Sequence, residues 1–290
     1  MQRKLSHSQN FFRDKGVVQS LVDGTTIGKR DTVVEIGPGR GVITEVLSTY
    51  AGLVIAIEID RDLYNKLRLH FQSNSNVSVV QSDFLSWSLP THSYKIFSNI
   101  PFNTSADIVK KITANPKLAP KDAYLVMQKE AAEKYVGTIQ RNKRYSLQSV
   151  LLYPDYLISI ESQISRYSFK PVPRVAIVLL RIHKREQPLV VQEKRLLFRD
   201  FVVYGFGQWK PTLGDSYAGI FSREQVKNIS RELNILTQKP SQVEPCRWVE
   251  LFEVFSTHVS LEKQKKIHGS EQRLLTQQAQ LSKQYRTRKL

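Results

Sequence analysis

The sequence is poor in cysteine and contains no long apolar run. Cys246 is the single cysteine among 290 residues, which excludes an internal disulfide and is typical of a reducing compartment. No segment reaches 18 uninterrupted apolar residues, and the opening stretch "MQRKLSHSQNFFRD" lacks the apolar centre of a signal peptide. We therefore expect a cytoplasmic protein that makes no use of a membrane.

Acidic residues are the minority among the charged side chains. Asp and Glu total 26 against 43 Lys and Arg, so the formal net charge is +17. Such an excess concerns the partners of a protein and not its fold. Nucleic acid is the leading interpretation, with an anionic membrane surface or simple solubility as alternatives. The 41% of hydrophobic residues is enough for a core in one large or two ordinary domains.

Between residues 31 and 183, apolar β-rich runs alternate with helical periods. Strand candidates occupy 32–37, 53–60, 77–83 and 94–100. Because these runs are apolar throughout, they predict an α/β fold with a mostly parallel sheet that helices cover on both faces. Two later runs, 156–164 and 174–183, have no helix between them, and we predict that they pair as a hairpin at the sheet edge.

The composition changes after His183. Residues 184–258 are polar with helical periods, which predicts a small helical domain. The remainder has few apolar residues, and from Ser260 onward it holds eight Lys or Arg and two Glu. We interpret 259–290 as a basic tail, either a frayed helix or a flexible disordered segment, and 1–183 as the first domain.

A glycine-rich loop follows the first predicted strand. In "EIGPGRG", Gly37, Gly39 and Gly41 stand between that strand and a helix, where glycine permits a positive φ and a close approach of a ligand to the backbone. The dinucleotide pattern G-x-G-x-x-G fails because position 42 is Val, and the Gly-Lys-Ser/Thr of a phosphate-binding loop does not follow. The remaining E-x-G-x-G-x-G pattern is similar to the loop of S-adenosylmethionine methyltransferases.

Acidic residues end the next two predicted strands. Glu58 is placed to accept hydrogen bonds from the two ribose hydroxyls of such a cofactor, and Asp83 from its adenine amino group, with Phe84 beside the adenine ring. The alternative is that each acid caps the helix that follows. Since both lie at the carboxyl edge, where sheets of this kind bind ligands, we favour the cofactor interpretation.

The fourth predicted strand ends in Ser98-Asn99-Ile100-Pro101-Phe102. An exocyclic adenine amine is a weak nucleophile, and two acceptors, the Asn99 side chain and the Ile100 carbonyl, can orient it toward a methyl donor. Pro101 stiffens the turn, and Phe102 can stack on a base that has been flipped out. The alternative is a plain turn with an Asn cap and a core Phe.

These motifs together resemble the rRNA adenine-N6 methyltransferases, a superfamily that includes the erythromycin-resistance (Erm) enzymes and the KsgA-type small-subunit dimethylases. The resemblance covers most of residues 6–183, and it is carried by "SQNFFRD", "VVEIGPGRGVITEVL", "VIAIEID", "QSDFL", "SNIPFNTSADIVKKI", "LVMQKEAAEKY" and "FKPVPRVAIVLLRI". It implies a Rossmann-like methyltransferase domain that uses S-adenosylmethionine and no metal.

The resemblance also implies roles for individual residues. Phe169 corresponds to a second aromatic near the target base, beside the turn at 99–102. The residues that it places on the cofactor are Asn10, Phe12, Gly37, Gly39, Gly41, Glu58, Ile59, Asp83, Phe84 and Asn99.

Details within the superfamily favour the Erm branch. The KsgA type usually carries Gly-Asn-Leu-Pro-Tyr where this chain has Ser-Asn-Ile-Pro-Phe, and "KREQPLV" (184–190) and "FRDFVVYGFGQWKPTL" (198–213) resemble Erm sequences. The resemblance implies methylation of one adenine N6 in 23S rRNA, which lowers macrolide, lincosamide and streptogramin B binding.

We expect a monomer that acts on naked 23S rRNA or on the assembling large subunit, with 184–258 binding the RNA. Two alternatives remain. One is dimethylation of adjacent adenines in small-subunit rRNA. The other is a relative that has lost catalysis and only binds nucleic acid.

Overall fold

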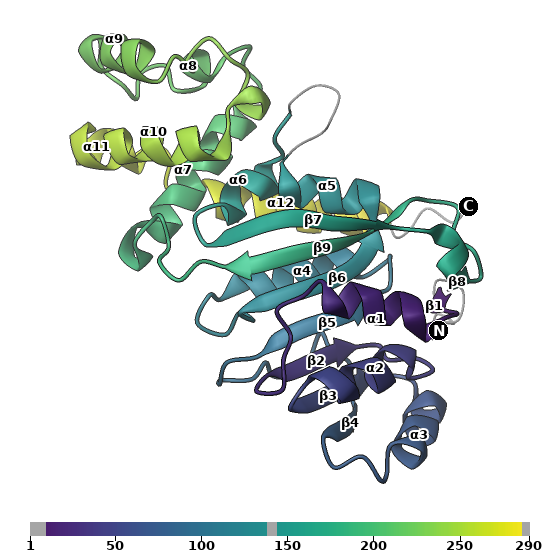
Figure 1. Ribbon diagram of the computed structural model, residues 1–290. Coiled ribbons are helices and arrows are strands. Elements are labelled where there is room, and N and C mark those ends of the chain that lie inside the picture. Colours follow the sequence, from purple (N-terminus) through teal and green to yellow (C-terminus); the bar gives the residue numbers. More distant parts are fainter. Residues whose placement is uncertain (1–9, 138–143, 286–290) are drawn as a thin grey trace. The chain divides into compact units, whose positions relative to one another are not determined.

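The computed structural model describes residues 10–137 and 144–285. They form two compact units. The sheet unit runs from the first described residue to Val136 and from Tyr156 to Glu186, and the helical unit holds Gly137, 144–155 and the residues from Gln187 onward. Figure 1 labels the elements of both units.

The sheet unit is built on a seven-stranded sheet with the order β4-β3-β2-β5-β6-β9-β7. The first five of these strands are parallel, β9 is antiparallel to β6, and β7 is antiparallel to β9. The strands in sheet order are β4 (Val77–Gln81), β3 (Leu53–Glu58), β2 (Thr32–Ile36), β5 (Lys95–Asn99), β6 (Asp122–Gln128), β9 (Ile177–Lys184) and β7 (Tyr156–Ile164). The predicted parallel sheet is confirmed, and the two late runs do pair at its edge.

Helices cover both faces of this sheet. In Figure 1, α1 and α2 lie in front of the strands and α4 lies behind them. Val18 of α1 and Leu47 of α2 are fully buried in one apolar cluster with side chains of β2, β3 and β6. The helices of this unit are α1 (Lys15–Asp23), α2 (Val42–Tyr50), α3 (Arg61–His70), α4 (Ser105–Ala114) and α5 (Lys129–Val136).

A two-stranded sheet ties the N-terminal segment to this unit. Its strands, β1 (Phe11–Phe12) and β8 (Phe169–Lys170), are antiparallel, with Phe12 opposite Phe169 and Phe11 opposite Lys170. Successive side chains of a strand point to opposite sides. The register therefore turns Phe12 and Phe169 to one side, and Phe11 and Lys170 to the other.

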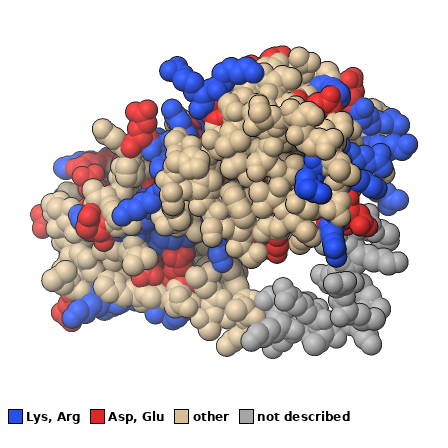
Figure 2. Space-filling model, turned by 90° about the horizontal axis from the view of Figure 1, so that it is seen from below, with Lys and Arg blue, Asp and Glu red and all other residues tan. Residues whose placement is uncertain are grey.

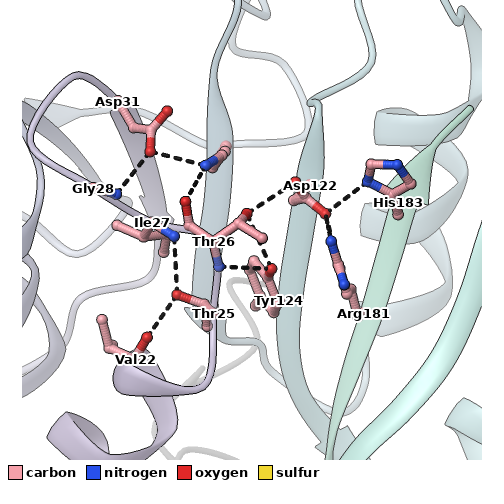
Figure 3. A network of polar contacts seen from close by, with 11 residues as sticks. Val22, Thr25, Thr26, Ile27, Gly28, Asp31, Asp122, Tyr124, Arg181 and His183 are labelled. Atoms are coloured by element: carbon pink, nitrogen blue, oxygen red, sulfur yellow. Dashed lines mark hydrogen bonds and ion pairs between the residues drawn. The ribbon is translucent and has the colours of Figure 1, made fainter. Parts of the chain in front are cut away.

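A network of polar contacts lies at the amino ends of β5 and β6 (Figure 3). The carboxylate of Asp122 is 1% exposed, and it accepts hydrogen bonds from the Thr26 hydroxyl at 3.1 Å and from Arg181 Nε at 2.9 Å, with His183 Nδ1 also 2.9 Å away. Nearby, the buried Lys95 forms an ion pair with Asp31 at 2.8 Å and donates to the Thr26 carbonyl. Every charged group here has a partner, as buried polar groups require.

The helical unit surrounds an aromatic core. Phe201, Trp248 and Phe255 are fully buried, and Tyr217 stacks on Phe201 with ring centroids 4.6 Å apart. Its helices are α6 (Leu147–Leu152), α7 (Arg195–Gly207), α8 (Leu213–Ser216), α9 (Arg223–Glu232), α10 (Pro245–His258), α11 (Leu261–Lys265) and α12 (Ser270–Tyr285). Among the described residues, no helix is long and apolar enough to cross a membrane.

The C-terminal region is helical and packs against α7. Ile267 is fully buried, and Arg199 Nε of α7 donates to a Glu271 carboxylate oxygen of α12 at 2.7 Å. The Asp200 carboxylate accepts from the backbone amides of Gly269 at 2.8 Å and Glu271 at 2.9 Å. The helices α11 and α12 fit the helical alternative. The packing of the segment was not predicted, because its partners lie some seventy residues earlier and composition does not show them. Residues 286–290 lie outside the described part of the chain.

The two units also divide the chain differently from the predicted boundaries. After Val136 the chain contributes Gly137 and 144–155, including α6, to the helical unit, and it returns to the sheet unit at Tyr156. The prediction had placed all of these residues in the first domain. The final crossing, after Glu186, lies three residues beyond the predicted boundary.

Candidate active site

A small hollow lies at the carboxyl edge of β2 and β5. It brings together three segments that are far apart in the sequence: the N-terminal segment, the glycine loop and the turn after β5. Its lining residues are Asn10, Phe11, Gly37, Asn99, Ile100, Pro101 and Phe102. Six of these seven are among the site residues that the sequence predicts, and Phe11 is not.

The side chain of Asn99 is held in one orientation. Its Nδ2 donates to the backbone carbonyl of Asn10 at 2.6 Å. A carboxamide has a donor end and an acceptor end, so using the donor leaves Oδ1 as the group for a substrate. The contact with Asn10 thus orients Asn99 so that its Oδ1, at the end of β5, is left to accept a hydrogen bond.

The three glycines of the loop have different roles. All have positive φ, at 65° for Gly37, 58° for Gly39 and 83° for Gly41. A Cβ on Gly39 would lie 2.4 Å from the Phe11 ring, and one on Gly41 2.9 Å from Leu67, whereas nothing lies within 4 Å of that position at Gly37. A side chain at 39 or 41 would therefore force Phe11 or Leu67 to shift, whereas Gly37 faces open space.

Glu58 points into the protein and secures the glycine loop. Its side chain is buried, and its two carboxylate oxygens accept from Gly39 N at 3.1 Å and Asp60 N at 2.9 Å. Burial raises its pKa, and these backbone donors oppose that shift. The predicted ribose contact would use the lone pairs that remain on the same oxygens.

Glu35 is a buried acid that the sequence reasoning did not single out. Its Oε2 accepts from the Thr44 hydroxyl at 2.6 Å, and its Oε1 has no hydrogen-bond partner among the described residues. Burial raises the pKa of this carboxyl to about 8. An acid inside the otherwise apolar "TVVEIG" was the signal that could have identified it.

The predicted cofactor residues that follow β3 and β4 differ in exposure. Asp83 is exposed and accepts from Leu85 N at 2.8 Å, and Ile59, the residue after β3, is 47% exposed. Phe84 is instead 5% exposed, and the Lys111 ammonium lies 5.3 Å from its ring centroid. Asp83 and Ile59 are accessible to a ligand, whereas Phe84 is buried, and its contact with adenine stays a prediction.

Phe12 and Phe169 also lie in the core. They are 6% and 1% exposed, and their ring centroids are 4.5 Å apart. The β1–β8 register turns both rings inward, and their contacts with a cofactor and with a base stay predictions. Phe11 turns outward instead and lines the hollow, with the Arg40 guanidinium 5.3 Å from its ring centroid.

These groups suit a cationic nucleoside cofactor. Gly37 leaves the backbone open, Glu35 has an unpartnered buried oxygen, and Asp83 and Ile59 offer an acceptor and an apolar surface outside it. A ligand with an ammonium, a sulfonium and an adenine can use each of them. Within the described ranges, no cluster of three His, Cys, Asp or Glu side chains could hold a metal ion.

Comparison with known proteins shows which family the chain belongs to. The sequence model of the family described as ribosomal RNA adenine dimethylase matches residues 1–257. An rRNA adenine N-6-methyltransferase of Bacillus licheniformis is 27% identical over 252 residues, covering 87% of this chain and 86% of the relative. A probable ribosomal RNA small subunit methyltransferase A of Methanopyrus kandleri is 28% identical over 260 residues, covering 84% and 88%.

A solved structure agrees with these matches. The crystal structure of the 23S rRNA methyltransferase ErmE superposes with a TM-score of 0.78 at 26% identity, covering 86% of this chain and 100% of that one. Family membership implies S-adenosylmethionine as the cofactor. The chain belongs to the ribosomal RNA adenine dimethylase family and is an S-adenosylmethionine-dependent rRNA adenine N6-methyltransferase.

Proposed function

We propose that this enzyme methylates N6 of one specific adenine in 23S rRNA and thereby lowers the binding of macrolides, lincosamides and streptogramin B to the ribosome. The observation that carries this proposal is the likeness to a 23S rRNA methyltransferase, which extends over the full length of that chain. The sequence details "SNIPF" and "KREQPLV" support the same branch. The enzyme acts as a cytoplasmic monomer on naked 23S rRNA or on the assembling large subunit.

The charge of the molecule supports an RNA partner. The net charge is +17, and Lys and Arg side chains gather at the right-hand edge of the face in Figure 2. Lys and Arg that contact phosphates give affinity without sequence information, so base contacts must select the adenine. In this proposal the helical unit supplies RNA contacts and the sheet unit supplies the chemistry.

The residues of the hollow have distinct roles in the proposed reaction. Asn99 Oδ1, fixed by the Asn10 contact, accepts a hydrogen bond from the target amine, and the Ile100 carbonyl accepts the other. These bonds turn the nitrogen lone pair out of the ring plane and toward the methyl group that S-adenosylmethionine supplies when bound. After transfer the amine loses its extra proton to water, and no strong base is needed.

Phe102 provides the surface for the flipped base. It is half-buried and lines the hollow, in a turn that Pro101 stiffens and that the Thr104 amide closes by donating to the Pro101 carbonyl at 3.2 Å. An aromatic face stacks on any base and so helps to hold an unpaired one. Phe102 thus positions the adenine, and Asn99 orients its amine.

The small-subunit alternative is supported by relatives named as small-subunit methyltransferases. A labelled-methyl assay on separate 23S and 16S transcripts, followed by mapping of the modified base, distinguishes the two. We expect transfer to a single adenine of 23S rRNA, with Asn99→Ala as the inactive control. Transfer to two adjacent adenines of 16S rRNA would contradict the proposal, and absence of transfer to either would favour a relative that only binds nucleic acid.

A further inference from the structure

Trp209 combines two unfavourable features in the helical unit. Its side chain is 95% exposed, and its backbone φ is +53°, in the left-handed region that residues other than glycine seldom adopt. An exposed indole leaves a large apolar surface in water, and the backbone conformation adds strain. Such a residue, two positions after the end of α7, points to a binding role and not to a packing role.

A hollow of about 320 Å³ adjoins this residue. None of its lining residues is acidic, and its charged group is Arg273. The guanidinium of Arg273 is held in place, since its two terminal nitrogens donate to the His268 carbonyl and to the Ser270 hydroxyl, each at 2.9 Å.

A second hollow in the same unit provides the contrast. It measures about 760 Å³ and lies along α9 and α10, with four glutamates among its lining residues, Glu224, Glu232, Glu250 and Glu253. Like charges disfavour the approach of a phosphate backbone. Of these two hollows, the one beside Trp209 is therefore the one suited to RNA.

We propose that Trp209 is a stacking platform for an unpaired base of the rRNA substrate, separate from the target adenine. The base lies on the indole face, the amides of Gln208 and Gln277 contact its edge, and Arg273 with the exposed Lys210 contacts the neighbouring phosphates. The inference deepens the proposed function, because it rests on binding of rRNA by this enzyme. It adds a second base contact, which would help to select the substrate.

The test compares Trp209→Ala, Trp209→Phe and the control Leu196→Ala, which shortens a side chain that is 76% exposed in the same unit. Binding of an rRNA fragment is measured with the full-length protein, together with cofactor affinity and melting temperature. We expect Trp209→Ala to weaken RNA binding about tenfold or more, and the Phe variant and the control to stay within about threefold. Cofactor affinity and melting temperature should not change in any of them, since none of the predicted cofactor-binding residues lies in the helical unit.

A scan with abasic sites in the same fragment identifies the base that stacks. One abasic position should weaken binding of the wild type about as much as Trp209→Ala does, and should not weaken binding of that variant further. Wild-type binding by Trp209→Ala, or the absence of such a position, would overturn the proposal. A loss seen only on assembling particles would also overturn it, in favour of a protein partner.

The proposed function can fail independently. If methylation occurs on 16S rRNA, the 23S target is wrong, and the same variants on the 16S fragment still test the platform.

Discussion

The two edges of the sheet differ in whether their buried polar groups all have hydrogen-bond partners. At the amino edge, Asp122 accepts bonds from Thr26 and Arg181 and contacts His183, and Lys95 pairs with Asp31 (Figure 3). At the carboxyl edge, by contrast, Glu35 keeps one buried oxygen without a partner among the described residues. The turn after β5 on that edge lines a hollow.

This difference indicates that the amino edge of the sheet mainly stabilises the fold and that the carboxyl edge mainly serves the reaction. A saturated network of buried charges holds strands in register, and removing one member leaves the others unpaired. A group with unused hydrogen-bonding capacity is unfavourable for folding but is available to a ligand. Substitutions at the carboxyl edge should therefore change activity at little expense in stability, and substitutions at the amino edge should do the reverse.

The largest effect is expected at Asn99. Asn99→Ala removes the acceptor that orients the amine, and we expect turnover to fall about 100- to 1,000-fold, as when one preorganised hydrogen-bonding group is lost elsewhere. Methyl transfer under single-turnover conditions measures this, with Asn103→Ala, an exposed neighbour, as the control. A loss of less than tenfold, or a parallel drop in melting temperature, would contradict the assigned role.

At the opposite edge, Asp122→Ala should lower stability. It leaves Arg181 and His183 without their shared carboxylate, and breaking a buried pair costs about 3–5 kcal/mol. Those two side chains are 27% and 26% exposed, so we expect about 3 kcal/mol, at the lower end of that range. Urea unfolding measures it, with the exposed Asp62→Ala as control. If turnover of the folded variant falls as much as for Asn99→Ala, the two edges are not separable.

An intermediate effect is expected at Phe102. Phe102→Ala removes a stack worth about 1–3 kcal/mol, or roughly tenfold to a hundredfold in turnover on RNA. Phe102→Tyr keeps the ring face and should be nearly silent, and cofactor affinity should change little in both. A structural Phe102 predicts another pattern, in which the Ala variant melts earlier and loses cofactor and RNA binding together.

The last expected effect is a pH dependence of stability that Glu35 causes, and it is small over any single pH unit. Its folded pKa of about 8 lies above its ordinary value of 4.5, so the protonated carboxyl favours the folded state at low pH, and this contribution is lost as the pH rises from about 4.5 to 8. Glu35→Gln stays neutral and can still accept from Thr44. The stability of the variant relative to wild type should rise by at most ~1.4 kcal/mol per pH unit within that window and level off above it. Unfolding curves at pH 5 to 9 measure this difference, and a constant difference would show that Glu35 is ionised throughout.

Local patterns in the sequence were sufficient to predict the sheet and the conformation of the glycine loop. Apolar runs without alternation predicted the parallel strands, and the glycines of the loop predicted positive φ, which all three adopt. The turn at 99–102 lines a hollow with Asn10 and Gly37, and the roles assigned to these residues stay predictions. These features follow from the sequence because dihedral requirements and strand periodicity depend on neighbours in the chain.

Tertiary pairing decided what local patterns could not. Phe12 and Phe169 are buried, and Phe11 lines the hollow, because strands 157 residues apart pair in one register and not in the register shifted by one residue. Likewise, Arg199 and Asp200 hold a basic C-terminal segment whose packing composition alone does not predict. In both places the deciding partner is remote in sequence, so only the folded chain determines which way the side chain faces.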